Sequence, residues 1–347
     1  MIDAEAWAQQ LGISRAAVDL YLASEVVDLH LDSFIWRRLF GYDLAREHGS
    51  GWLNGWFYSQ SDIPRLRAAG VGGAVWVITT NPLRSLRGRR DTLLDNVVRL
   101  RTELEAAGIA IAGDATAYAA IRARGQHAAL LGIQGGNALE YDLADFDRPE
   151  LAALSLVTLM HFTRSRIGTP ALPYPRGDQH LTRFGADYVR KLNERRVMVD
   201  LAHISHEGFQ DVLALHDRTQ PLTISHAACD AVFPHFRNVT DDELRAVANT
   251  GGVIGVIFNT AFLGGSLFNG RAERVIDHVQ HMLKVVGSRH VALGSDFDGA
   301  IIGPRDLRTI RELPRLVELM LRRGIPELDI QNVLGKSFLR AFAALRS

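Results

Sequence analysis

The chain alternates between two hydrophobic patterns. Continuous apolar runs, many of them rich in valine and isoleucine, are typical of strands buried on both faces of a parallel sheet. Longer stretches between them carry apolar residues at helical spacing, as at Leu93, Val97, Leu100 and Leu104. Eight runs have strand character: residues 26–32, 71–79, 128–134, 154–161, 197–203, 221–226, 252–259 and 290–296.

Eight β/α units in one chain predict a closed (β/α)8 barrel of the TIM type. An open, doubly wound sheet is the alternative, but no predicted strand leads into a glycine-rich dinucleotide loop. A further short run over 109–113 is interpreted as peripheral. We expect one domain over residues 1–347, with residues 1–22 as an extra N-terminal helix and a long loop over 40–62 at the catalytic mouth.

Composition narrows the function classes. The 347 residues include 39 basic and 39 acidic side chains, and 47% of them are hydrophobic. This composition excludes intrinsic disorder and gives no electrostatic footprint for nucleic acid or an anionic membrane. One cysteine, Cys229, rules out an intrachain disulfide framework. Because the sequence carries no secretory signal and no run long enough to span a bilayer, we expect a soluble, cytoplasmic protein.

Polar residues gather where the predicted strands end. These residues are His30 with Asp32, Gln134, His161, His203, His226 and Asp296. In a parallel barrel all these ends meet on the face where active sites are built. Imidazoles and a carboxylate from several strands make a typical metal-ligand set, and a metal-free polar pocket is the alternative. Ser225 precedes His226, but adjacent strand residues face opposite ways, so we do not expect a nucleophilic Ser–His pair.

A set of ordered motifs resembles the renal (membrane) dipeptidase family, the M19-type metallopeptidases of the amidohydrolase-like barrels. The matching stretches are VVDLHLDSF at 26–34, DIPRLRAAGVGGAVW at 62–76, ALLGIQGGNAL at 129–139, LSLVTLMH at 154–161, LTRFG at 181–185, VMVDLAHIS at 197–205, PLTISHAA at 221–228, RNVTDDELRAV at 237–247, GGVIGVIF at 251–258 and VALGSDFDG at 291–299. They cover nearly the whole chain, and together they are highly specific.

The resemblance implies a zinc centre and a set of ligands. Residues matching the family's first zinc site are His30 and Asp32, and those matching its second are His203 and His226. Two close metal ions activate a water molecule and polarise the scissile carbonyl. The implied substrate is a dipeptide or a related small amide, and homodimers are common in the family.

The resemblance also implies residues that act on the substrate. His161 matches the histidine that steadies the tetrahedral intermediate, and Arg237 matches the arginine that holds the substrate. Asp296 matches the aspartate that takes a proton and returns it to the leaving amine. All three residues are therefore expected to contact the substrate.

One position departs from the family in a way that affects the metals. Gln134 stands where the family has a glutamate that bridges both ions. A neutral amide cannot bridge two cations through two anionic oxygens, and dications about 3.5–4 Å apart repel strongly. Three hypotheses follow. The first is a working hydrolase with one metal ion, for which this ligation suits Zn²⁺ best. The second is a dinuclear enzyme that tolerates Gln134, and the third is a metal-free or non-peptidase relative that binds a small peptide-like ligand or acts in a biosynthetic pathway.

Overall fold

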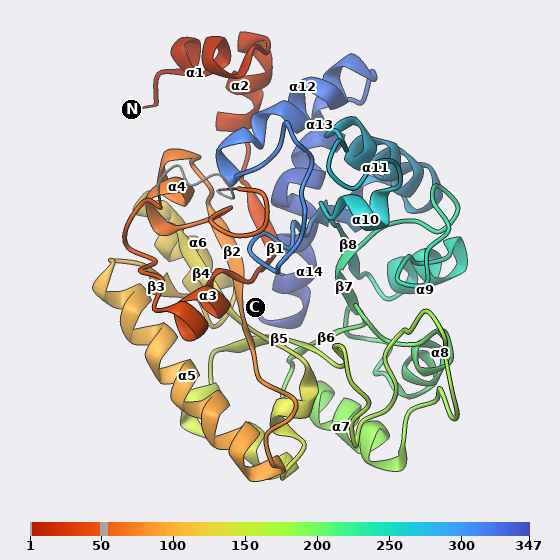
Figure 1. The fold of residues 1–347 in the computed structure, drawn as a ribbon. Coiled ribbons are helices and arrows are strands. Elements are labelled where there is room, and N and C mark those ends of the chain that lie inside the picture. Colours follow the sequence, from red (N-terminus) through yellow and green to blue (C-terminus); the bar gives the residue numbers. More distant parts are fainter. Residues whose placement is uncertain (1, 49–54) are drawn as a thin grey trace.

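Eight parallel strands close into a barrel in a computed structural model that describes residues 2–48 and 55–347 (Figure 1). The strands are β1 (Val27–Leu31), β2 (Gly73–Thr79), β4 (Ala128–Gln134), β5 (Leu154–Thr158), β6 (Met198–Asp200), β7 (Thr223–Ala227), β8 (Val253–Val256) and β9 (Val291–Leu293). The ring closes because β2 pairs with both β1 and β4. The predicted TIM-type barrel is therefore confirmed. The short β3 (Ala110–Ile111) pairs only with β4, outside the ring.

Helices surround the barrel, as Figure 1 shows. They are α1 (Ala4–Leu11), α2 (Arg15–Leu22), α3 (Ser33–Phe40), α4 (Ile63–Ala68), α5 (Leu86–Ala106), α6 (Ala115–Ala123), α7 (Arg183–Glu194), α8 (His206–Leu215), α9 (Asp241–Asn249), α10 (Thr260–Leu263), α11 (Glu273–Val286), α12 (Pro314–Arg322), α13 (Glu327–Gln331) and α14 (Ser337–Leu345). Within the described residues, no helix is both long and apolar enough to cross a membrane.

The N-terminal stretch folds as two helices where one was expected. Gly12 ends α1 in the left-handed conformation, with φ 62°, and the Ser14 side chain caps the first turn of α2. Trp7 and Tyr21 pack edge to face, with ring centroids 5.6 Å apart, and the Tyr21 hydroxyl donates to the carbonyl of Ala69. These contacts fix the helix pair to the segment that precedes β2.

Each of the eight predicted runs corresponds to one strand, but β7 ends one residue later than expected and several strands end earlier. His161, His203 and Asp296 lie in the segments that follow β5, β6 and β9. His203 and Asp296 adopt positive φ angles of 69° and 61°, which an extended strand does not allow. These side chains therefore come from the turns above the strands, where the backbone can direct them across the barrel mouth.

The predicted loop over 40–62 is shorter than expected at its start, because α3 runs to Phe40, and residues 49–54 lie outside the described residues. Its later part is anchored by Asp298. One carboxylate oxygen of Asp298 accepts the Gln60 amide at 2.8 Å, and the other accepts the Ser61 amide at 3.1 Å and the Ser33 hydroxyl at 2.6 Å. The buried Asp298 thus ties the loop and the start of α3 to the segment after β9.

Two glycines allow the strands to approach one another beneath the mouth. A Cβ atom on Gly255 would lie 2.0 Å from the carbonyl oxygen of Ser225, and one on Gly294 would lie 1.8 Å from the same oxygen. Backbone atoms cannot move aside as a flexible side chain can. The close packing of β7, β8 and β9 therefore requires glycine at both positions.

We predict that Gly255→Ala lowers the free energy of unfolding by about 3 kcal/mol, because the added methyl group overlaps a fixed carbonyl. Urea denaturation measures the change. Gly113→Ala is the matched control, since its Cβ would find its nearest neighbour at an ordinary 3.7 Å, on Ala153. Equal stability of the two variants would contradict the close-approach explanation.

Candidate metal centre and substrate pocket

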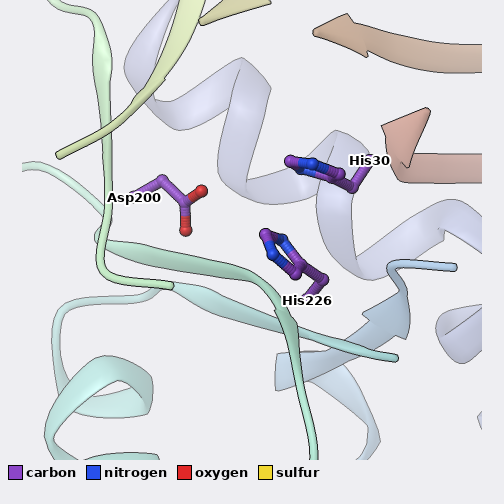
Figure 2. A group of neighbouring side chains, drawn as sticks. All are labelled: His30, Asp200 and His226. Carbon is purple, nitrogen blue, oxygen red and sulfur yellow. The ribbon is translucent and has the colours of Figure 1, made fainter. Parts of the chain in front are cut away.

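Two imidazoles from different strands lie side by side at the carboxyl end of the barrel. His30 belongs to β1 and His226 to β7, and their ring centroids are 4.0 Å apart. Figure 2 shows both rings with the carboxylate of Asp200 directed toward them. All three side chains are completely buried. The barrel therefore brings together residues that are almost 200 positions apart in sequence.

Two further histidines extend this group. Nε2 of His203 lies 2.9 Å from Nε2 of His226, and the ring of His161 is 4.8 Å from that of His203. Two imidazole nitrogens on one tetrahedral zinc ion are separated by about 3.3 Å when each Zn–N bond is about 2.0–2.1 Å. The facing nitrogens of His203 and His226 thus have nearly the separation that a shared metal ion requires.

Carboxylates complete a ligand set on the Nε2 side of His30. His30, Asp32 and Asp296 each offer a ligand atom, and these atoms lie within 4.8 Å of one another. Nε2 of His30 lies 3.8 Å from Oδ1 of Asp296. Neither of these two buried atoms has a hydrogen-bond partner among the described residues. Because buried polar atoms without partners are costly, the donor set fits a cation placed between them.

A second group of possible ligands consists of His30, Asp200 and His226. Its centre is filled by the chain itself. The Ser225 hydroxyl lies 2.6 Å from Oδ2 of Asp200, 2.7 Å from Nδ1 of His226 and 3.3 Å from Nδ1 of His30. An ion would compete with this hydroxyl, so the group is better described as a hydrogen-bonded support behind the two histidines.

The contact between Ser225 and His226 corrects the expectation that these adjacent side chains face opposite ways. The pairing of β7 with β8 changes register between Ile224 and Ala227. Strict alternation is interrupted there, so both side chains reach the inside of the barrel. The serine remains a poor nucleophile candidate, because it contacts Nδ1 of His226 and a buried carboxylate behind the imidazoles.

Gln134 lies between the two halves of the site. The Thr79 hydroxyl is 3.0 Å from Oδ1 of Asp32 and 3.0 Å from Oε1 of Gln134. The amide nitrogen of Gln134 is 3.5 Å from Nε2 of His203. The glutamine therefore touches the Asp32 side through Thr79 and the His203 side directly, and it brings no charge to either.

Burial sets the protonation states of the imidazoles. Desolvation, assisted by the charge of Arg237, lowers the pKa of His161 to about 3, and the pKa of His30 falls to about 3 for the same main reason. Burial also holds the pKa values of His203 and His226 well below the ordinary range. All four rings are neutral near pH 7 and can act as ligands or neutral hydrogen-bonding groups.

The carboxylates respond in the opposite direction. Burial raises the pKa of Asp32 to about 7, although the Thr79 hydroxyl partly offsets this by hydrogen bonding to the charged form. Burial and the nearby Asp32 hold the pKa of Asp296 well above the usual aspartate range. A neighbouring cation would favour the charged form of both groups.

Arg237 contributes a buried cation near the same histidines. Its Nε and Nη2 atoms have no hydrogen-bond partner among the described residues. Burial lowers its pKa to about 10, which still leaves the guanidinium charged at neutral pH. The ring of Phe262 lies 5.6 Å from the guanidinium carbon. An anionic or carbonyl oxygen would satisfy these free donors.

The structure brings together most of the residues proposed from sequence. His30, Asp32, Gln134, His161, His203, His226 and Asp296 are linked by the contacts described above. Sequence reasoning missed three supporting residues: Thr79, Asp200, and Thr158, whose hydroxyl donates to Oδ2 of Asp200. Asp200 did carry a signal, since a charged residue inside the apolar run VMVDLAH is unusual. The two threonines are ordinary strand residues and carried none.

Known proteins share both the sequence pattern and the fold. The family model described as Membrane dipeptidase (Peptidase family M19) matches residues 14–347. The probable dipeptidase PvdM from Pseudomonas aeruginosa has a TM-score of 0.85 and 17% identity, covering 97% of this chain and 98% of that chain. A metallo peptidase from Rhodobacter sphaeroides, liganded with a phosphinate mimic of the dipeptide L-Ala-D-Ala, has a TM-score of 0.80 and 22% identity, covering 92% and 98%. At these identities the structural likeness shows the fold.

Proposed function

Because the chain belongs to the membrane dipeptidase family M19, we propose that it is a dipeptidase-like metallohydrolase with an altered metal centre. Its substrate would be a dipeptide or a related small amide. The relative liganded with a dipeptide mimic supports this substrate class. Buried polar atoms that have no partner among the described residues carry the proposal: Nε2 of His30, Oδ1 of Asp296, and Nε and Nη2 of Arg237.

The metal ligands would be His30, Asp32, His203 and His226. Their nitrogen and oxygen donors suit zinc well, and the donor chemistry agrees with the buried, neutral imidazoles. When bound, the metal would supply an activated water and polarise the scissile carbonyl. We propose one ion in place of the family's pair, because Gln134 is neutral and its amide nitrogen lies 3.5 Å from Nε2 of His203.

Asp296 would be the residue that moves protons. Its Oδ1, which has no hydrogen-bond partner among the described residues, lies 3.8 Å from His30 Nε2, and burial raises its pKa, so this carboxylate accepts a proton more readily than an exposed aspartate does. It would take a proton from the attacking water and deliver it to the leaving amine. His161, neutral and beside His203, would donate a hydrogen bond to the oxygen that becomes negative.

Arg237 would bind the substrate through an oxygen of its carboxylate or amide. The guanidinium is buried and has free donors, so a substrate oxygen there would form charge-assisted hydrogen bonds. Such bonds orient a small substrate against the reacting groups and exclude water from the pocket.

We predict that Gln134→Glu raises the metal content from near one to near two equivalents per chain, because the new carboxylate offsets the repulsion between two ions. Elemental analysis after incubation with zinc and removal of excess metal measures the content. Gln126→Glu adds the same charge at an exposed position and serves as the control. An unchanged metal content in Gln134→Glu would show that this position does not limit the centre.

We also predict that Arg237→Gln reduces kcat/KM for alanyl dipeptides by about 10–100-fold, the loss expected for one or two charge-assisted hydrogen bonds. Most of the effect should appear in KM, with metal content unchanged. Dipeptides with L- and D-residues at the C-terminus should both be assayed. Wild-type kinetics in this variant would exclude Arg237 as the substrate anchor.

A further inference from the structure

A single buried hydroxyl supports both central histidines. The Ser225 side chain on β7 contacts Nδ1 of His30, Nδ1 of His226 and Oδ2 of Asp200. Serine and aspartate are completely buried, so no solvent reaches this group. Figure 2 shows the carboxylate of Asp200 facing the two imidazoles, and the Ser225 hydroxyl lies 2.6 Å from Oδ2 of this carboxylate.

Asp200 is surrounded by hydrogen-bond donors. Its Oδ1 accepts the backbone amides of Ala202 at 3.1 Å and Ser225 at 2.7 Å. Its Oδ2 accepts the hydroxyls of Thr158 and Ser225. Four donors satisfy both oxygens of an ionised carboxylate, which can only accept hydrogen bonds. An ionised Asp200 therefore requires the Ser225 hydroxyl to donate its proton to Oδ2 of Asp200.

The Ser225 hydroxyl has one proton and two acceptor lone pairs. When that proton is donated to Asp200, the oxygen can only accept from the two imidazoles. Each imidazole must then carry its proton on Nδ1 and leave Nε2 unprotonated. For His30, Nε2 is the buried atom that has no partner among the described residues, and for His226 it is the atom facing His203.

We propose that Ser225, oriented by Asp200, is a positioning residue that fixes His30 and His226 together in the Nδ1–H tautomer with Nε2 available as a metal ligand. This inference rests on the proposed metal centre for its purpose, although the tautomers themselves do not require metal. The carboxylate of Asp200, which reaches both imidazoles through the Ser225 hydroxyl, also makes these two ligands more basic. Gln134 brings no charge to the centre, whereas Asp200 supplies negative charge close behind the ligands.

The backbone of β7 is shaped for this contact. The register change between Ile224 and Ala227 allows Ser225 and His226 to reach the same side. Gly255 and Gly294 leave room for the Ser225 carbonyl, which their Cβ atoms would meet within 2.0 Å. Both features place the hydroxyl between the two rings.

The tautomers can be measured directly in metal-free protein labelled with ¹⁵N. Long-range proton–nitrogen spectra of the imidazoles at neutral pH distinguish protonated from unprotonated nitrogens. We expect protonated Nδ1 and unprotonated Nε2 for both His30 and His226, assigned by comparison with His30→Asn and His226→Asn. A protonated Nε2 on either ring in the unaltered chain would overturn the proposal.

Zinc affinity, measured by competition with a chromophoric chelator, tests whether the Ser225 hydroxyl strengthens metal binding by His30 and His226. We expect Ser225→Ala to weaken zinc binding by about 10–100-fold, the usual cost of losing a partner behind a ligand. Ser225→Thr retains the hydroxyl and should retain most of the affinity. Thr223→Val is the matched control, because Thr223 is a buried hydroxyl on the same strand that donates only to the carbonyl of Val253, at 2.9 Å.

Equal zinc affinities for Ser225→Ala and Thr223→Val would contradict the positioning role. The spectrum of the unaltered chain needs no variant, so a misfolded Ser225→Ala protein leaves the test intact. Failure of the unaltered chain to bind zinc would contradict the proposed metallohydrolase function. The tautomers measured without metal would then decide the present inference separately.

Discussion

Closing a parallel sheet into a ring removes water from the carboxyl ends of its strands, where this chain places four histidines and several aspartates. Each buried polar group must then find a partner inside the protein or in a ligand. Asp200 and Asp298 find theirs in backbone amides and hydroxyls. Nε2 of His30, Oδ1 of Asp296, and Nε and Nη2 of Arg237 have none among the described residues. The fold thus separates carboxylates that build the site from groups left free to bind.

Gln134, the position that departs from the family pattern, lies between the two halves of the site. Gln134 contacts Thr79 on one side and His203 on the other, so its side chain joins the His30–Asp32 half to the His203–His226 half without adding charge. A neutral connection leaves the repulsion between two dications unopposed. A single ion among the same ligands needs no bridging anion, which is why we propose one metal ion for this centre.

Much of the architecture could be predicted because parallel strands buried on both faces form continuous apolar runs. Adjacent residues of β4, such as Leu130 and Leu131, belong to different apolar clusters, which is why this run shows no polar alternation. The strand ends could not be placed as well, since the positive φ angles of His203 and Asp296 leave no mark on hydropathy. The inward turn of Ser225 depends on a register change that only the assembled sheet shows.

The candidate residues of the site could be chosen one by one from motifs, whereas the residues that support them could not. The histidines and aspartates at the strand ends have recognisable chemistry, and the barrel explains why they meet. Thr79 and Thr158 gain their roles only from the strands beside them, through hydrogen bonds to Asp32 and Asp200. Sequence shows which groups could react, while the three-dimensional pairing shows which of them are held and which remain free.

We propose that this barrel holds one metal ion, where the resemblance to its family implies two. Anomalous diffraction at the zinc edge, from crystals grown with excess zinc, would count and place the ions in one experiment. Our account predicts a single peak among His30, Asp32, His203 and His226. Two peaks about 3.5–4 Å apart on either side of Gln134, or no peak at all, would contradict it.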